Sequence, residues 1–143
     1  MSILFFSKDI SFKVAHPIAV RRWIKHITEN EESDAGNINI IFCSDKYLIK
    51  INKKHLGFDY YTDIITFNYS IDNLIAGDLF ISVERVKENA TGFATGFNNE
   101  LLRVIAHGIL HLLKYDDSTP QKKQLMTSKE NFYLEEWSKG IKH

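Results

Sequence analysis

Two histidines and an acidic pair lie close together in the segment 107–117, HGILHLLKYDD. Residues four positions apart lie one turn apart on the same face of an α-helix, so His107 and His111 present both imidazoles to one side. Two side chains make an incomplete metal site, and Asp117 follows ten residues after His107, where the chain turns back. The spacing therefore predicts one metal ion held by His107, His111 and Asp117, with Asp117 rather than Asp116 as the third ligand.

The helix that carries the two histidines is apolar on nearly every side, which predicts that it is buried. Its apolar residues are Leu101, Leu102, Val104, Ile105, Ile109, Leu110, Leu112 and Leu113. Histidines at this spacing also occur as structural residues of a core. Two unpaired imidazoles inside a buried helix would be costly, however, so burial and the following carboxylate favour the metal site.

Position 108, directly after the first histidine, bears on the type of metal chemistry. Metalloproteases of the HExxHxxGxxH type use the same spacing of three ligands and place their general-base glutamate at this position. Here the residue is Gly108, which argues against ordinary zinc-peptidase chemistry. We expect a small residue beside the metal to let a bulky substrate approach the helix backbone.

The segment 107–117 resembles the signature HGxLHLxGYDH of the YbeY family, the metal-dependent endoribonucleases of bacterial rRNA maturation. Upstream, residues 51–52 and 61–67 (IN and YTDIITF) resemble the family's LN and PTDVLSF, and residues 76–82 (AGDLFIS) resemble LGDIxIS. These segments follow the family order, and with the flanking elements the resemblance covers nearly the whole chain. It implies a single-strand-specific endoribonuclease of ribosome biogenesis, with an rRNA precursor as substrate, the ribosome as partner, and no DNA.

The chain departs from the family pattern at three places. Asp117 replaces the family's third histidine, an exchange of one acceptable ligand for another. Lys114 replaces a glycine, so the helix must end without the usual left-handed glycine. His55 and Leu56 stand where the family has Tyr-Arg, so a cation for the RNA is missing there.

Two histidines and one carboxylate leave positions open on the metal, as in catalytic zinc sites. Zinc is therefore the expected cofactor, although two-His-one-carboxylate sites also hold Fe(II) and other divalent metals. Three functions fit this donor set: the endoribonuclease, another metallohydrolase such as a peptidase, and a non-catalytic ribosome-associated module whose metal holds the fold. The general base and the other catalytic residues stay unassigned.

Candidate substrate-binding residues lie on two predicted helices. Lys50, Lys53 and Lys54, next to His55, form the best local basic patch, which is either a site for the RNA backbone or a solvated helix face. Arg103 lies four residues before His107 on the histidine face. Arg103 forms either a salt bridge one turn away from the metal, which we favour, or a contact that supports a ligand or binds a phosphate.

Asp63 and Asp78 lie at family motif positions, and each follows a strand or turn signal. Aspartate at such places often accepts hydrogen bonds from backbone N–H groups. We expect this structural role for Asp63 and leave the role of Asp78 open.

Length and charge place limits on the whole protein. A chain of 143 residues predicts one domain over 1–143, and its 18 basic and 18 acidic residues balance, so an RNA site must be a local patch. The only cysteine, Cys43, cannot form an internal disulfide. Since no signal peptide or long apolar span is present, we expect a cytoplasmic protein that does not associate with membranes.

Alternating and helical patterns predict an α/β (α+β) fold with helices packed on a small mixed sheet. The predicted strands are 3–6, 10–14, 38–43, 64–68 and 75–82, and the last two form a hairpin. Predicted helices begin at Pro17, after the Ser44 cap, at position 83, after an Asn98 cap and at Pro120; 30–37 and 91–98 are connections. The last helix runs to about Ser138 and turns Met126, Tyr133 and Trp137 inward.

Overall fold

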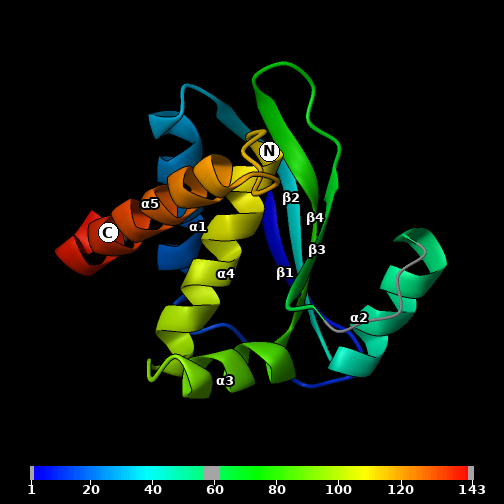
Figure 1. The fold of residues 1–143 in the computed structure, drawn as a ribbon. Helices are drawn as coiled ribbons and strands as arrows, with labels where there is room; N and C mark the ends of the chain where they lie inside the picture. Colours follow the sequence, from blue (N-terminus) through cyan, green and yellow to red (C-terminus); the bar gives the residue numbers. More distant parts are fainter. Residues whose placement is uncertain (1, 57–61, 142–143) are drawn as a thin grey trace.

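The computed structural model describes residues 2–56 and 62–141, in which four strands form one mixed sheet of order β1-β2-β4-β3 (Figure 1). Strands β1 and β4 pair parallel to β2, whereas β3 pairs antiparallel to β4, which confirms the predicted hairpin. Strand β3 is thus an edge strand. The strands are β1 (Ile3–Ser7), β2 (Asp34–Cys43), β3 (Ile64–Asn68) and β4 (Leu74–Ser82).

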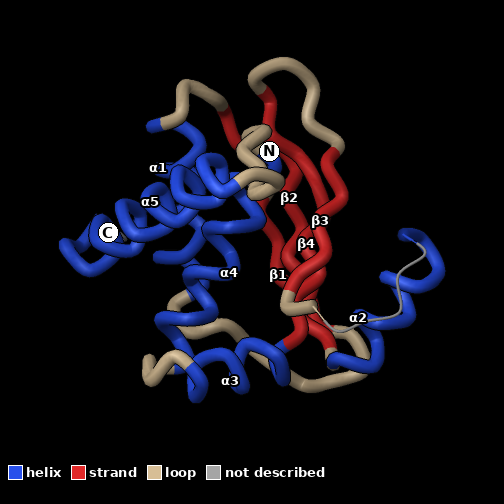
Figure 2. The backbone as a smooth tube through the Cα atoms, viewed as in Figure 1, coloured by secondary structure: helices blue, strands red, loops and turns tan. Residues whose placement is uncertain are grey.

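The helices divide between the two faces of the sheet. Helices α1 and α4 pack on one face, α5 crosses near the C-terminal end of α4, and α2 lies on the opposite side (Figures 1 and 2). The helices are α1 (Pro17–Asn30), α2 (Asp45–Ile51), α3 (Val83–Gly92), α4 (Phe97–Leu112) and α5 (Pro120–Glu136). Single π-helical turns extend α2 and α5, namely η1 (Asn52–Leu56) and η2 (Trp137–Ile141).

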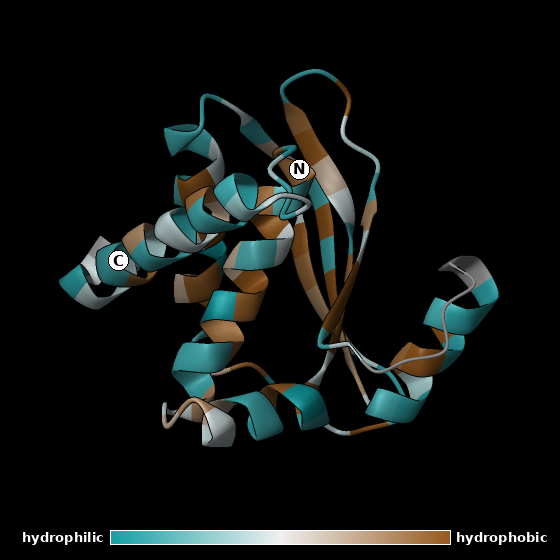
Figure 3. Ribbon diagram, in the orientation of Figure 1, coloured by the Kyte–Doolittle hydropathy of each residue, from teal (hydrophilic) through white to brown (hydrophobic). Residues whose placement is uncertain are grey.

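The main core lies between the sheet and helices α1 and α4. Apolar residues gather on the central strands and on the inner sides of these helices (Figure 3). Fully buried members include Trp23, Ile24, Ile38, Ile40, Leu79, Ile81, Ile105 and Ile109. Cys43, Leu48 and Ile65 form a second, smaller cluster beneath α2. The predicted α+β architecture is confirmed, and so is the burial of the helix that carries the histidines.

The segment 10–14 is not a strand, contrary to the alternating pattern. Asp9 and His16 have φ angles of 27° and 55°, so the chain bends on both sides of the segment and cannot run extended along the sheet. Phe12 nevertheless packs inward, with its ring centroid 4.8 Å from that of Phe42. The alternating pattern therefore indicated side chains that pack on the core, although the segment is not a strand.

Two further boundaries differ from the sequence prediction. Strand β2 already begins at Asp34 within the predicted loop 30–37, because Asp34 and Ala35 pair with the start of β4. Helix α4 begins after Gly96 rather than after Asn98, and Gly96 provides no side-chain cap.

Residues 57–61 lie outside the described residues, as do the side chains of His55 and Leu56. No described helix is both long and apolar enough to cross a membrane.

Candidate metal centre

Gly108 allows helix α4 to pack closely on the sheet. A Cβ atom at this position would lie 2.5 Å from Leu79 Cδ2 and 2.7 Å from Ile64 Cδ1, both too close for ordinary contact. The expectation that Gly108 opens the helix to a bulky substrate is wrong, because this side of α4 faces the strands. A glutamate here would collide with the same side chains, so the structure has no place for the metalloprotease general base at position 108.

A turn after α4 leads the chain to Asp117. The N–H of Lys114 donates to the carbonyl of His111, and the N–H of Tyr115 donates to that of Leu110, each at 3.0 Å. This pair of bonds is a Schellman motif, whose left-handed position is normally a glycine. Lys114 occupies it with a φ of 75°, so the helix ends without the family's glycine, as expected, but keeps the left-handed turn.

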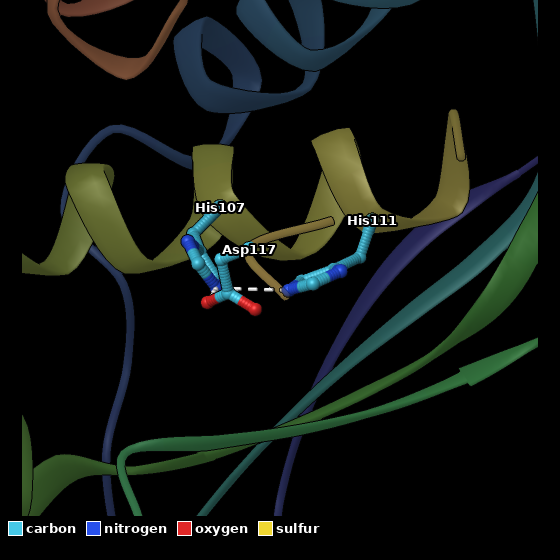
Figure 4. A group of neighbouring side chains, drawn as sticks. All are labelled: His107, His111 and Asp117. Atoms are coloured by element: carbon cyan, nitrogen blue, oxygen red, sulfur yellow. Dashed lines mark hydrogen bonds and ion pairs between the residues drawn. The ribbon is translucent and has the colours of Figure 1, made fainter. Parts of the chain in front are cut away.

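The two histidines and Asp117 converge on one point (Figure 4). The Nε2 atoms of His107 and His111 are 2.9 Å apart, and His107 Nε2 lies 3.8 Å from Asp117 Oδ2. One donor atom from each residue lies within 4.8 Å of the others, close enough for one metal ion to bind all three. Asp116 instead accepts hydrogen bonds from the backbone N–H and the hydroxyl of Ser118.

Glu130 of α5 joins the site from outside the histidine helix. His107 Nδ1 lies 2.6 Å from Glu130 Oε2, and Arg103 Nη1 donates to Glu130 Oε1 at 3.1 Å. When the Nδ1–H group donates a hydrogen bond to the Glu130 carboxylate, the lone pair of the ring lies on Nε2, the nitrogen that is turned toward His111 and Asp117. Arg103 thus forms the favoured salt bridge, and through Glu130 it also supports a candidate ligand.

Glu130 is not among the residues predicted from the sequence, although a signal for it is present there. Met126, Tyr133 and Trp137 were predicted to face inward from the last helix, and position 130 falls on the same helical stripe. Glu130 is only 6% exposed. A carboxylate in a buried stripe requires a cation or a donor, and that requirement could have indicated a second element at the metal site.

The two candidate ligand histidines have pKa values shifted in opposite directions. Burial acts to lower the pKa of His107, but the hydrogen bond and charge of Glu130 outweigh it and raise the pKa above the ordinary value. Burial and the neighbouring His107 lower the pKa of His111. Burial is also the main cause that raises the pKa values of Asp63 and Glu100.

A cleft of about 750 Å³ opens in front of the histidines, between α4, the edge strand β3 and the start of η1. Four carboxylates and one guanidinium line it among the described residues: Asp63, Glu100, Asp117, Glu130 and Arg103. This excess of negative charge attracts a metal ion and repels a bare phosphate. A cation in the cleft would therefore favour the approach of a nucleic-acid backbone.

Of the other residues singled out in the sequence, some line this cleft and some do not. Lys53 and Lys54 are exposed on η1, next to Asn52, which lines the cleft, but the two lysines do not line it themselves. Asp63 accepts a backbone hydrogen bond from Ile64, as predicted, and also lines the cleft. Asp78 accepts a hydrogen bond from Asn39 Nδ2 at 3.0 Å, across the paired strands β2 and β4.

Comparison with known proteins decides the family. Residues 6–138 match the family model described as endoribonuclease YbeY. The chain belongs to the YbeY family. It is 44% identical over 131 residues to the endoribonuclease YbeY of Parabacteroides distasonis, with 92% of each chain covered, and 45% identical over 126 residues to that of Flavobacterium johnsoniae, with 88% of this chain and 91% of the relative covered.

A solved structure has the same fold. The solution structure of a Thermotoga maritima protein matches with a TM-score of 0.68 and 27% identity, over 99% of this chain and 96% of that chain. The predicted resemblance to YbeY proteins is confirmed, and with it the predicted class of enzyme, a hydrolase that cuts RNA internally.

Proposed function

We propose that this YbeY protein is a metal-dependent endoribonuclease that cleaves single-stranded RNA during rRNA maturation. The observation that carries the metal dependence is the convergence of His107, His111 and Asp117 on one point of an acidic cleft. The proposed cofactor is one zinc ion, for which imidazole and carboxylate ligands are suitable, and another divalent metal such as Fe(II) also fits. Zinc bound there supplies a Lewis acid and a water of lowered pKa.

Side chains around the proposed metal site orient its ligands and can bind protons. Glu130 fixes the orientation of the His107 ring, and the guanidinium of Arg103 in turn fixes Glu130. Asp63 and Glu100 line the cleft, and burial raises the pKa of each, so each carboxyl binds a proton more readily than an exposed one would. We assign Asp63, which lies in the field of His107, as the candidate general base.

An unpaired strand is the proposed substrate because duplex RNA is a stiff A-form rod in which the phosphates and bases are hard to reach. Lys53, Lys54 and His55 are proposed to contact the RNA backbone, together with Arg103, which lines the cleft. The natural substrate is an rRNA precursor on the cytoplasmic ribosome, and DNA and membranes are not partners. We further propose that 1–143 acts as one domain.

The test compares the zinc-loaded protein with His107→Ala on labelled RNA. We expect the parent to cleave single-stranded RNA, to leave duplex RNA and single-stranded DNA largely intact, and to lose activity when the metal is removed. His107→Ala should lose zinc and activity but keep its fold, because an open three-ligand site serves catalysis. If parent and variant both leave single-stranded RNA intact, the endoribonuclease function is rejected. Unfolding of the parent by chelators would instead favour the non-catalytic metal module.

A further inference from the structure

Glu31, which directly follows α1, collects donors from two distant segments. Its side chain is 9% exposed. Its Oε1 accepts a hydrogen bond from the hydroxyl of Tyr115 at 2.6 Å, and its Oε2 accepts one from the hydroxyl of Tyr133 and one from Lys129 Nζ, the latter at 3.1 Å. Burial acts to raise the pKa of Glu31, but these three partners outweigh it and lower the pKa.

The first of these partners belongs to the turn that carries the proposed third ligand. Tyr115 lies two residues before Asp117, and its backbone forms a hydrogen bond with the His111 ring. Its N–H also closes the Schellman motif at the end of α4. The hydroxyl of Tyr115 therefore joins Glu31 to the short segment that determines where Asp117 and His111 point.

The other two partners belong to the stretch of α5 that supports the first histidine. Lys129 directly precedes Glu130, and Tyr133 follows it by three residues, one turn away. Glu130 in turn contacts His107 Nδ1 at 2.6 Å. One carboxylate thus bonds to the turn that carries Asp117 and to the stretch of α5 that carries Glu130.

Helix α1 is anchored in the core and is bonded to α5, so it can hold other segments in fixed positions. Its Trp23 is fully buried, and Trp23 Nε1 donates to the Tyr133 carbonyl at 2.8 Å. One and two turns along the same face, His26 lies 3.2 Å from Glu136, and Asn30 Nδ2 donates to the Tyr133 hydroxyl at 3.0 Å. Glu31 follows these residues at the end of α1 and extends the contacts of α1 from α5 to the turn that carries Asp117, which is called the ligand turn below.

We propose that Glu31 is a positioning residue of the metal centre. Its carboxylate holds the turn that carries Asp117 and the stretch of α5 that carries Glu130 in one arrangement. The inference rests on the proposed metal site and deepens it. Glu31 touches no candidate ligand, so its effect passes through Tyr115, Lys129 and Tyr133.

The experiment measures metal binding in Glu31→Ala and Tyr115→Phe, with Ile24→Val as the control. Ile24 is fully buried in α1, so Ile24→Val weakens the same helix without touching the hydrogen bonds. The readouts are the zinc dissociation constant, by competition with a chromophoric chelator, and the visible spectrum of the cobalt(II)-loaded protein, which reports ligand geometry. We expect both variants to bind zinc about tenfold more weakly and to change the cobalt bands, with Glu31→Gln in between and the control unchanged.

Equal zinc affinity and an unchanged cobalt spectrum in both variants would overturn the positioning role, as would an equal loss in Ile24→Val. A parent protein that binds no zinc, or binds it equally after His107→Ala, would overturn the proposed site and this inference together. A parent that binds zinc through His107 and cleaves RNA, with Glu31 variants that match it, would overturn the positioning role alone.

Discussion

At the scale of single residues, the candidate metal centre depends on groups that support the candidate ligands. Arg103, Glu130 and His107 form a chain in which each member fixes the next, and the carboxylate is almost fully buried. Outer partners of this kind orient an imidazole and raise its basicity as a ligand. The orientation of the His107 ring therefore depends on a residue of another helix.

Replacement of Glu130 by glutamine should weaken zinc binding by about 10-fold to 100-fold, because the amide can still accept from His107 Nδ1 but lacks the negative charge. Glu135→Gln is the matched control, since Glu135 lies on the same helix and is 65% exposed. The measurement is chelator competition at constant pH. Equal zinc affinities in the two variants would show that the carboxylate does not support the ligand.

At the scale of elements, the turn after α4 is held in a conformation that suits its sequence poorly. Lys114 has a φ of 75°, where a side chain with a Cβ is unfavourable, yet the two Schellman hydrogen bonds keep it there. The family's signature has a glycine at this place. The ligand turn is thus formed by backbone bonds and by the contact of Tyr115 with Glu31.

Lys114→Gly should raise the free energy of unfolding by about 1 kcal/mol, because glycine adopts the left-handed conformation without strain. The same exchange at Lys87, which is exposed inside α3, should lower it by about 1 kcal/mol, because glycine is a poor residue for a helix interior. Urea denaturation measures both changes. A decrease in both variants would contradict the strain at position 114.

The proposed RNA-backbone contacts of η1 can be tested through the salt dependence of binding. Lys53→Ala with Lys54→Ala should weaken single-stranded RNA binding and flatten the log–log salt slope by roughly 0.7 for each lost phosphate contact. Lys8→Ala with Lys13→Ala is the control, since both residues are exposed near β1, at the opposite edge of the sheet from β3. If the two double variants have the same slope, the η1 lysines form only a solvated helix face.

At the scale of the whole molecule, α1 connects the core to the turn that carries Asp117 and to α5, which carries Glu130. Trp23 and Ile27 are fully buried, while Glu31 at the end of the helix is bonded to the ligand turn and to α5. The same carboxylate should therefore contribute to overall stability as well as to the site. Its lowered pKa makes that contribution depend on pH.

Because the partners of Glu31 lower its pKa in the folded protein, the unfolded chain binds the proton more tightly. Its stabilising effect is complete above the ordinary value of 4.5 and is lost as pH falls through the folded value. Glu31→Gln should lower the free energy of unfolding by about 1.5–3 kcal/mol at pH 7, and this difference should narrow below pH 4.5. Urea denaturation of both proteins from pH 7 to pH 3 measures it, and a constant difference would contradict the linkage.

The sequence by itself determined the features that depend on local spacing. Two histidines four apart share a helix face whatever the rest of the chain does, and alternation placed β3 and β4 in a hairpin. The ordered motifs determined the family. Assignment of the metal to His107, His111 and Asp117 stays a prediction, but the spacing alone indicated the three residues that the structure brings within 4.8 Å.

Only the tertiary structure decided which distant faces meet. Glu130 lies 23 residues beyond His107 and Glu31 lies 84 before Tyr115, and no local periodicity relates such positions. Packing also decided that Gly108 faces the strands and that Asp63 faces the cleft. The physical reason is that periodicity determines which side of an element is apolar, whereas the partner of each side depends on how all the apolar faces are buried together.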